Sequence, residues 1–80
     1  MRQTYGVGTE LEQDLFAVRL RTLRQRRKLS RVRLGELCGL DKNAVGRYEA
    51  GKARPKLDAL MALADYFGVT LDQLVGRDRL

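Results

Sequence analysis

The 80-residue sequence contains no histidine and no tryptophan, and it has one cysteine and one proline. Without histidine, and with Cys38 as the only thiol, the usual ligands of a zinc site and the base of a Ser-His-Asp triad are missing. The carboxylates are scattered, with no paired spacing for acid/base catalysis. The sequence therefore predicts neither an enzyme nor a protein that holds a metal or another cofactor.

Long apolar runs and an export signal are also absent. Charged residues interrupt the apolar stretches, so none approaches the ~20 residues of a membrane span. No charged start followed by an apolar block opens the chain, and a secreted domain this small would be expected to need several disulfides. We therefore expect a soluble cytoplasmic protein, in which 44% apolar residues supply one small core.

The positive charge is concentrated in the middle of the chain. The net charge of +6 divides into −2 over residues 1–18, +10 over residues 19–56 and −2 over residues 57–80. A basic segment of this kind fits a nucleic-acid binder, although an acidic protein could also be its partner and a solvated basic face would need none. A membrane surface is disfavoured, because the arginines of the first predicted helix are spread around much of its circumference.

Apolar residues recur at helical spacing, and no stretch alternates long enough to predict a strand. The predicted class is all-α, with five short helices in one domain over residues 10–80 and a flexible arm over residues 1–9. Capping residues predict four helix starts, at Thr9, Ser30, Asp41 and Thr70. Glycines predict helix ends, at Gly39, Gly51, Gly68 and Gly76.

Apolar stripes predict which side of each helix is buried. In the first helix the stripe is Phe16, Leu20 and Leu23, and in the second it is Leu34, Leu37 and Cys38. The stripe of the fourth helix consists of Leu57, Leu60, Leu63, Ala64 and Phe67. Cys38 is interpreted as a small core residue and not as a redox switch.

Residues 31–50 carry two short helices that meet at Gly39, where we expect a side chain to obstruct the turn, and Gly35 allows them to pack closely. The motifs of this stretch and its flanks are Phe16-Ala17-x-x-Leu20-x-x-Leu23-Arg24, Leu29-Ser30, Leu34-Gly35, Gly39, Val45, Arg47-Tyr48-Glu49-x-Gly51, Pro55 and Phe67-Gly68-Val69. Together they resemble the helix-turn-helix domain of Cro/C1 phage repressors and their Xre-type bacterial relatives, over about residues 14–76. The resemblance implies a compact five-helix, lambda-repressor-like domain that binds double-stranded DNA, with its helix-turn-helix formed by the second and third helices.

In that family the second helix of the motif lies in the major groove. Carried over by position, the base-reading residues are Lys42, Asn43 and Arg47. Their chemistry fits, since asparagine pairs with adenine N6 and N7 while arginine and lysine donate to guanine O6 and N7.

The resemblance also implies phosphate contacts and one structural ion pair. Phosphate contacts carry over to Arg31, where the family commonly has glutamine, and to Lys52 and Arg54 in the loop after the motif. The ion pair, shielded from solvent, carries over to Arg24 and Glu49. For four further basic residues a solvated surface is at least as good an interpretation: Arg26, Arg27, Lys28 and Arg33.

Family members usually pair two copies to bind a palindrome. The resemblance thus implies a homodimeric, repressor-like regulator associated with the nucleoid, with no evident small-molecule ligand. Its dimer contact is expected in the C-terminal segment, at Leu71, Leu74 and Val75 with Arg77 at the rim, unless Leu74 belongs wholly to the core.

A second interpretation is an antitoxin-like or coactivator-like module whose main partner is another protein. The side chains on the exposed face of the third helix discriminate between the two. A protein-binding face would be expected to show aromatic or aliphatic anchors there, whereas this chain has Lys42, Asn43 and Arg47.

Overall fold

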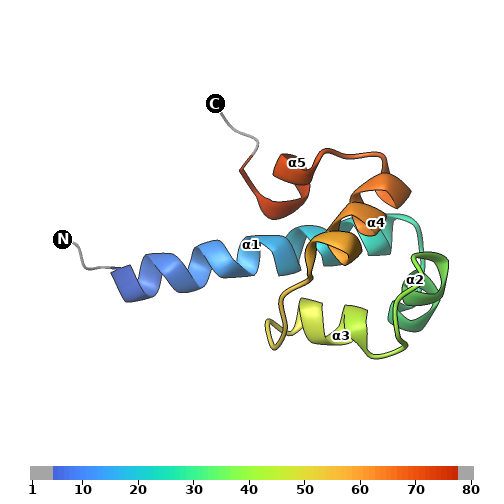
Figure 1. Ribbon diagram of the computed structural model, residues 1–80. Coiled ribbons are helices and arrows are strands. Elements are labelled where there is room, and N and C mark those ends of the chain that lie inside the picture. The colour runs from blue at the N-terminus through green and yellow to red at the C-terminus, as the bar shows by residue number, and fades with distance from the viewer. Residues whose placement is uncertain (1–4, 78–80) are drawn as a thin grey trace.

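Five helices make up the fold in the computed structural model, which describes the backbone of residues 5–77 and the side chains of residues 15–77 (Figure 1). They are α1 (Tyr5–Arg26), α2 (Arg31–Leu37), α3 (Ala44–Glu49), α4 (Leu57–Phe67) and α5 (Leu71–Val75). The described residues contain no strand, and the predicted all-α class is confirmed. None of the described helices is both long and apolar enough to cross a membrane.

Helix α1 begins earlier than predicted. The cap at Thr9 predicted a start near Glu10, but the helix is continuous from Tyr5 through Gly6 and Gly8. A glycine in a helix costs only about 1 kcal/mol and does not forbid it. Residues 5–9 of the predicted arm are therefore helical, residues 1–4 lie outside the described part of the chain, and the flexibility of the arm stays a prediction.

The turn between α2 and α3 depends on two glycines for different reasons. Gly39 has φ +73°, a conformation that other residues rarely adopt, while a Cβ added there would meet nothing within 4 Å. The expected obstruction at Gly39 is thus wrong, and its backbone conformation is what matters. At Gly35 a Cβ would lie 3.1 Å from the carbonyl oxygen of Asp41, so this glycine does permit close packing.

Helix α3 starts at Ala44, three residues after Asp41. The Asp41 Oδ1 accepts a hydrogen bond from the amide of Asn43 at 2.7 Å, and residues 42–43 form a turn. Aspartate commonly bonds the backbone two residues on, which favours a turn over an immediate helix start. The predicted helix start directly after Asp41 is therefore wrong, and Lys42 and Asn43 precede α3.

The core lies where the five helices meet, with α2 contributing Leu34. Phe16 and Tyr48 pack edge to face with ring centroids 6.0 Å apart. The largest fully buried side chains are Leu20, Leu34, Leu63, Leu74 and Val45.

Two predicted core residues are exposed. Leu37 ends α2 and Leu57 begins α4, with 40% and 61% of their surface exposed. Helix ends extend past the residues that pack beneath them, and periodicity alone carries no information on this. Ala59, outside the predicted stripe, is buried instead.

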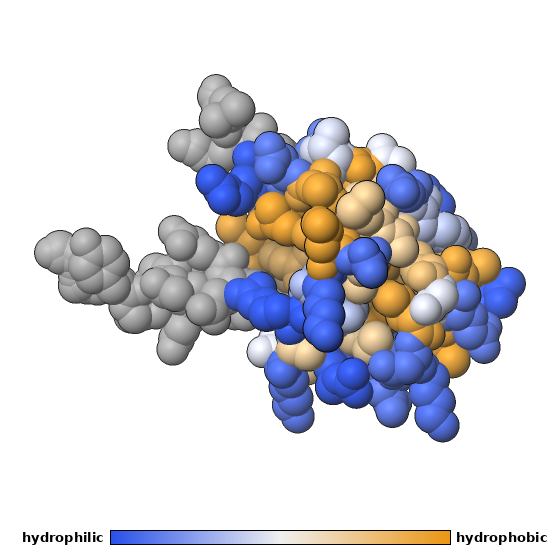
Figure 2. All heavy atoms as spheres, viewed as in Figure 1, coloured by the Kyte–Doolittle hydropathy of each residue, from blue (hydrophilic) through white to orange (hydrophobic). Residues whose placement is uncertain are grey.

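Helix α5 packs its Leu74 completely into the core, with 0% exposed. The capping box of Thr70 and Gln73 that starts this helix is present, as predicted. Leu74 is therefore not available to a dimer contact, and that assignment is corrected. Leu71 is 37% exposed and Val75 is half-buried, and apolar surface gathers over α4 and α5 (Figure 2).

Cys38 packs against the core at the C-terminal end of α2, with its Sγ 3.9 Å from the carbonyl oxygen of Ala62. Burial raises the pKa of the Cys38 thiol. The reactive thiolate is thereby suppressed, in agreement with a packing role.

Candidate nucleic-acid interface

A shallow groove runs between the N-terminal end of α2 and the exposed face of α3. The residues that line it are Ser30, Arg31, Val32, Lys42, Asn43, Gly46, Arg47, Ala50 and Lys52. Five of the six predicted DNA contacts thus share one surface. The sixth, Arg54, lies in a neighbouring depression that Arg47 also lines. At Gly46 an added Cβ would lie 3.6 Å from the Arg31 Cδ, which is an ordinary van der Waals contact, so Arg31 does not require a glycine at residue 46.

Arg47 makes a weak contact within the groove. Its Nη2 lies 3.5 Å from Asp41 Oδ2, and the two side chains are 49% and 62% exposed. Exposed pairs of this kind contribute about 0–1 kcal/mol. Arg47 can therefore exchange this contact for another at small cost.

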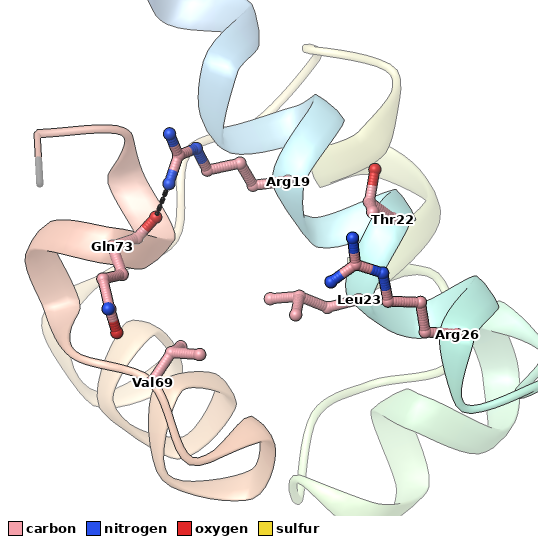
Figure 3. Close-up of a pocket in the computed structure, with 6 residues that line it drawn as sticks. All are labelled: Arg19, Thr22, Leu23, Arg26, Val69 and Gln73. Atoms are coloured by element: carbon pink, nitrogen blue, oxygen red, sulfur yellow. Dashed lines mark hydrogen bonds between the residues drawn. The ribbon is translucent and has the colours of Figure 1, made fainter.

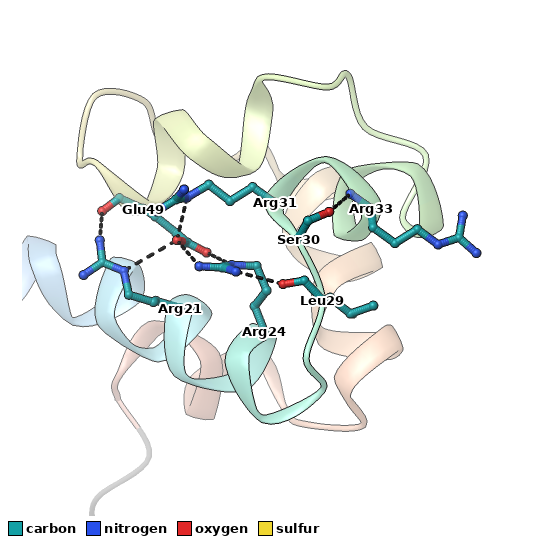
Figure 4. Close-up of polar contacts among 7 residues, drawn as sticks. All are labelled: Arg21, Arg24, Leu29, Ser30, Arg31, Arg33 and Glu49. Atoms are coloured by element: carbon teal, nitrogen blue, oxygen red, sulfur yellow. Dashed lines mark hydrogen bonds and ion pairs between the residues drawn. The ribbon is translucent and has the colours of Figure 1, made fainter.

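Glu49 and Arg24 form the ion pair that the resemblance implies (Figure 4). Arg24 donates from Nε to Oε2 at 2.6 Å and from Nη2 to Oε1 at 3.0 Å, and the Glu49 side chain is only 1% exposed. Arg24 also donates from Nη1 to the carbonyl of Leu29 at 2.8 Å. The pair therefore ties α1 to α3 and to the turn before α2.

Two further arginines contact the same carboxylate. Arg31 donates from Nε to Glu49 Oε1 at 3.1 Å. Arg21 places Nε 3.5 Å from that oxygen and donates from Nη2 to the Glu49 carbonyl at 3.2 Å. No motif in the sequence singles out Arg21, although its position three residues before Arg24 puts both on one side of a helix. Three guanidinium groups thus surround one carboxylate.

Acidification should weaken the fold through Glu49. Burial alone would raise the pKa of Glu49. Arg24 and Arg31 act in the opposite direction, because their positive charges and their hydrogen bonds to the carboxylate favour its ionised form. Together they outweigh burial and lower the pKa of Glu49 below its ordinary 4.5. The carboxylate therefore contributes stability that is fully present above about pH 4.5 and is lost as pH falls through the lower folded-state pKa.

We expect the melting temperature, followed by circular dichroism, to drop below pH 4.5. Glu49→Gln should lack this part of the pH dependence, while Glu36→Gln, which changes an exposed carboxylate, should keep the parent profile. Parallel profiles for the parent and Glu49→Gln would contradict this assignment.

Other basic side chains are engaged away from the groove. Arg27 stacks on Tyr66 and Phe67, with its Cζ 5.2 and 5.4 Å from the ring centroids. Arg33 pairs with Glu36 at 3.1 Å on the exposed side of α2. These contacts favour a surface role for both arginines.

A second pocket lies between α1 and the start of α5 (Figure 3). It is lined by Arg19, Thr22, Leu23, Arg26, Val69 and Gln73. Arg19 donates to the carbonyl of Gln73 at 2.7 Å and so holds α5 against α1. Because residues two or five apart on a helix face different directions, Arg19 and Arg26 are on another side of α1 from Arg21.

Known proteins resemble this chain over most of its length. The helix-turn-helix domain family matches residues 15–75. Identity is 41% over 61 residues with the HTH-type transcriptional regulator AnsR of Bacillus subtilis (strain 168), covering 76% of this chain and 53% of AnsR. Identity is 34% over 61 residues with the cryptic phage CTXphi transcriptional repressor RstR of Vibrio cholerae, covering 76% of this chain and 55% of RstR.

The immunity repressor protein of Bacillus phage phi105 is 31% identical over 62 residues, covering 78% of this chain and 43% of the repressor. The chain thus spans about half the length of the curated relatives it matches. No solved structure matches. The five-helix fold and the match over residues 15–75 show that the chain belongs to the helix-turn-helix domain family, as a Cro/C1-type member of a DNA-binding class that is not enzymatic.

Proposed function

We propose that the protein is a sequence-specific regulator of transcription, of the repressor type, that binds a palindromic operator as a homodimer. The observation that carries this proposal is the groove, in which Lys42, Asn43 and Arg47 are flanked by Arg31 and Lys52. The names of the relatives, a transcriptional regulator and two repressors, support it.

We propose that some of these residues contact the bases of the DNA and that others contact its phosphates. Lys42 and Asn43 lead into α3 and Arg47 follows one turn later, so the N-terminal end of α3 enters the major groove and these residues read base edges. Arg31, Lys52 and Arg54 bind phosphates on either side. The exposed face of α3 offers no aromatic or large aliphatic anchor among its groove-lining residues, which disfavours a protein as the main partner.

The test is selection of bound duplexes from a random pool, at low and at near-physiological salt. We expect enrichment of a two-fold symmetric site, with half-sites about one helical turn apart, that persists as salt rises. Binding that enriches no sequence and fades steeply with salt would mean that only the phosphates are attracted. That outcome would contradict the proposal and favour the protein-binding module.

Arg47→Ala should then lose a guanine preference at one position of each half-site, at a cost of about 1–3 kcal/mol per contact. The measurement is affinity for the selected site and for its single-base variants. Lys52→Ala is the control, since loss of a phosphate contact weakens all sequences alike. Uniform weakening by Arg47→Ala would make Arg47 a phosphate contact instead.

The homodimer contact that we propose uses the outer side of α5, through Leu71 and Val75 with Arg77 at the rim. Leu71 is 37% exposed, and Leu57 and Met61 of α4 add exposed apolar surface. Apolar side chains left in water favour association with a second such surface. Sedimentation over a range of concentrations measures this association directly.

A further inference from the structure

We propose that Arg21 and Arg31 form a phosphodiester-binding clamp, organised by Glu49, at the edge of the groove. The inference rests on the proposed function and adds to it a contact from α1. The clamp is defined by these two arginines and by the single oxygen, Glu49 Oε1, that both of their Nε atoms approach, at 3.5 and 3.1 Å.

Positive charge exceeds negative charge around Glu49, and this excess favours the binding of an anion. The buried Arg24 already satisfies Glu49 with two hydrogen bonds, at 2.6 and 3.0 Å. Arg21, Arg24 and Arg31 share the one negative charge of Glu49, so the three arginines and this carboxylate together carry an excess of two positive charges. Like charges held close together repel one another, and a bound anion relieves that repulsion.

The donor groups of the clamp are available. Arg31 contacts Glu49 only through Nε, so both of its terminal nitrogens lack a partner among the residues that the structure describes. Arg21 contacts Glu49 through Nε and Nη2, so its Nη1 also lacks a partner among the described residues. Their side chains are 46% and 54% exposed, so an anion can reach them, and the planar guanidinium matches phosphate oxygens in geometry.

The clamp lies at the edge of the groove, and this position favours a DNA phosphate as its anion. Arg31 lines the groove itself, and Arg21 is bonded to the carbonyl of the last residue of α3 (Figure 4). A duplex seated in the groove carries its backbone past this edge. Because Glu49 already holds both side chains in place, binding costs less side-chain entropy than it would for free arginines.

The test compares Arg21→Gln with Arg26→Gln. Both remove one charge from α1, but Arg26 faces the pocket of Figure 3 and not the groove. Affinity is measured by fluorescence anisotropy for the selected operator and for a scrambled duplex, from low to near-physiological salt.

We expect Arg21→Gln to weaken binding to both duplexes by roughly tenfold and to lower the salt slope by about 0.9, and Arg26→Gln to change the slope clearly less. Arg21→Lys should keep most of the salt slope while losing part of the affinity. Lysine retains the positive charge but lacks the paired donors of the guanidinium group. Matching melting temperatures would exclude a folding effect.

Equal affinities and slopes for Arg21→Gln and Arg26→Gln would overturn the clamp while leaving the proposed function intact. Failure of the parent chain to prefer its selected operator over the scrambled duplex is a different result. It would overturn the proposed function, and with it the assignment of DNA as the ligand of the clamp.

Discussion

Glu49→Ala is expected to destabilise the domain by about 3–5 kcal/mol, because it strands the buried Arg24 guanidinium. Small domains are stable by only about 5–15 kcal/mol, so this loss is a large part of the total and should lower the urea midpoint markedly. Among the described residues, Arg24 would keep one hydrogen-bond partner, the Leu29 carbonyl at 2.8 Å. Urea unfolding followed by circular dichroism measures the loss.

The three-arginine cluster makes this effect asymmetric. Arg24→Ala leaves Glu49 with Arg31 at 3.1 Å and Arg21 at 3.5 Å, so the carboxylate stays compensated. We therefore expect Arg24→Ala to cost less than Glu49→Ala, whereas an isolated pair would cost about the same from either side. Equal losses would show that Arg21 and Arg31 contribute nothing to Glu49 in the folded state. Glu36→Ala, which removes an exposed carboxylate, is the control and should change stability little.

Leu74→Ala is expected to cost about 2–5 kcal/mol, because Leu74 is fully buried and its truncation leaves a cavity between α1, α4 and α5. Leu71→Ala, one turn earlier on the same helix, changes a side chain that is 37% exposed and should cost far less. Urea unfolding of the two variants at one protein concentration makes the comparison.

Leu71→Ala and Leu74→Ala also distinguish an effect on core packing from an effect on dimer formation. Under the proposed dimer, Leu71→Ala lowers the sedimentation coefficient at concentrations where the parent is paired and leaves the monomer folded. If Leu74→Ala instead melted like the parent and reduced association, Leu74 would be an interface residue and the assignment to the core would be wrong.

Local chemistry accounts for the parts of this protein that could be predicted from sequence. The cap at Ser30, whose Oγ accepts from the Arg33 amide at 3.0 Å, and the capping box of Thr70 are interactions between near neighbours in the chain. The left-handed glycines that end α2 and α4, Gly39 and Gly68, are likewise properties of single residues. The composition of the groove also follows from the sequence, since Lys42, Asn43 and Arg47 are close together in the chain.

Predictions failed where a distant or competing contact decided the outcome. Asp41 could cap a helix or close a turn. The hydrogen bond that its Oδ1 accepts from the Asn43 amide stabilises the turn. Leu57 and Leu37 had the right spacing for the core, but they stand at helix ends beyond the residues that pack beneath them. Leu74 could have faced either the core or a partner until the position of α5 on α1 buried it.

The sequence by itself determined the all-α class, the caps at Ser30 and Thr70 and the basic segment from residue 19 to residue 56, because each of these depends on neighbouring residues. Only the tertiary structure decided that Arg21, Arg24 and Arg31, from two helices, meet at Glu49 on a third. The physical reason is that side chains 18 to 28 residues apart in sequence approach one another only when the core packs. Helical periodicity gives the direction of each side chain about its own axis, but it carries no information on which helix lies opposite.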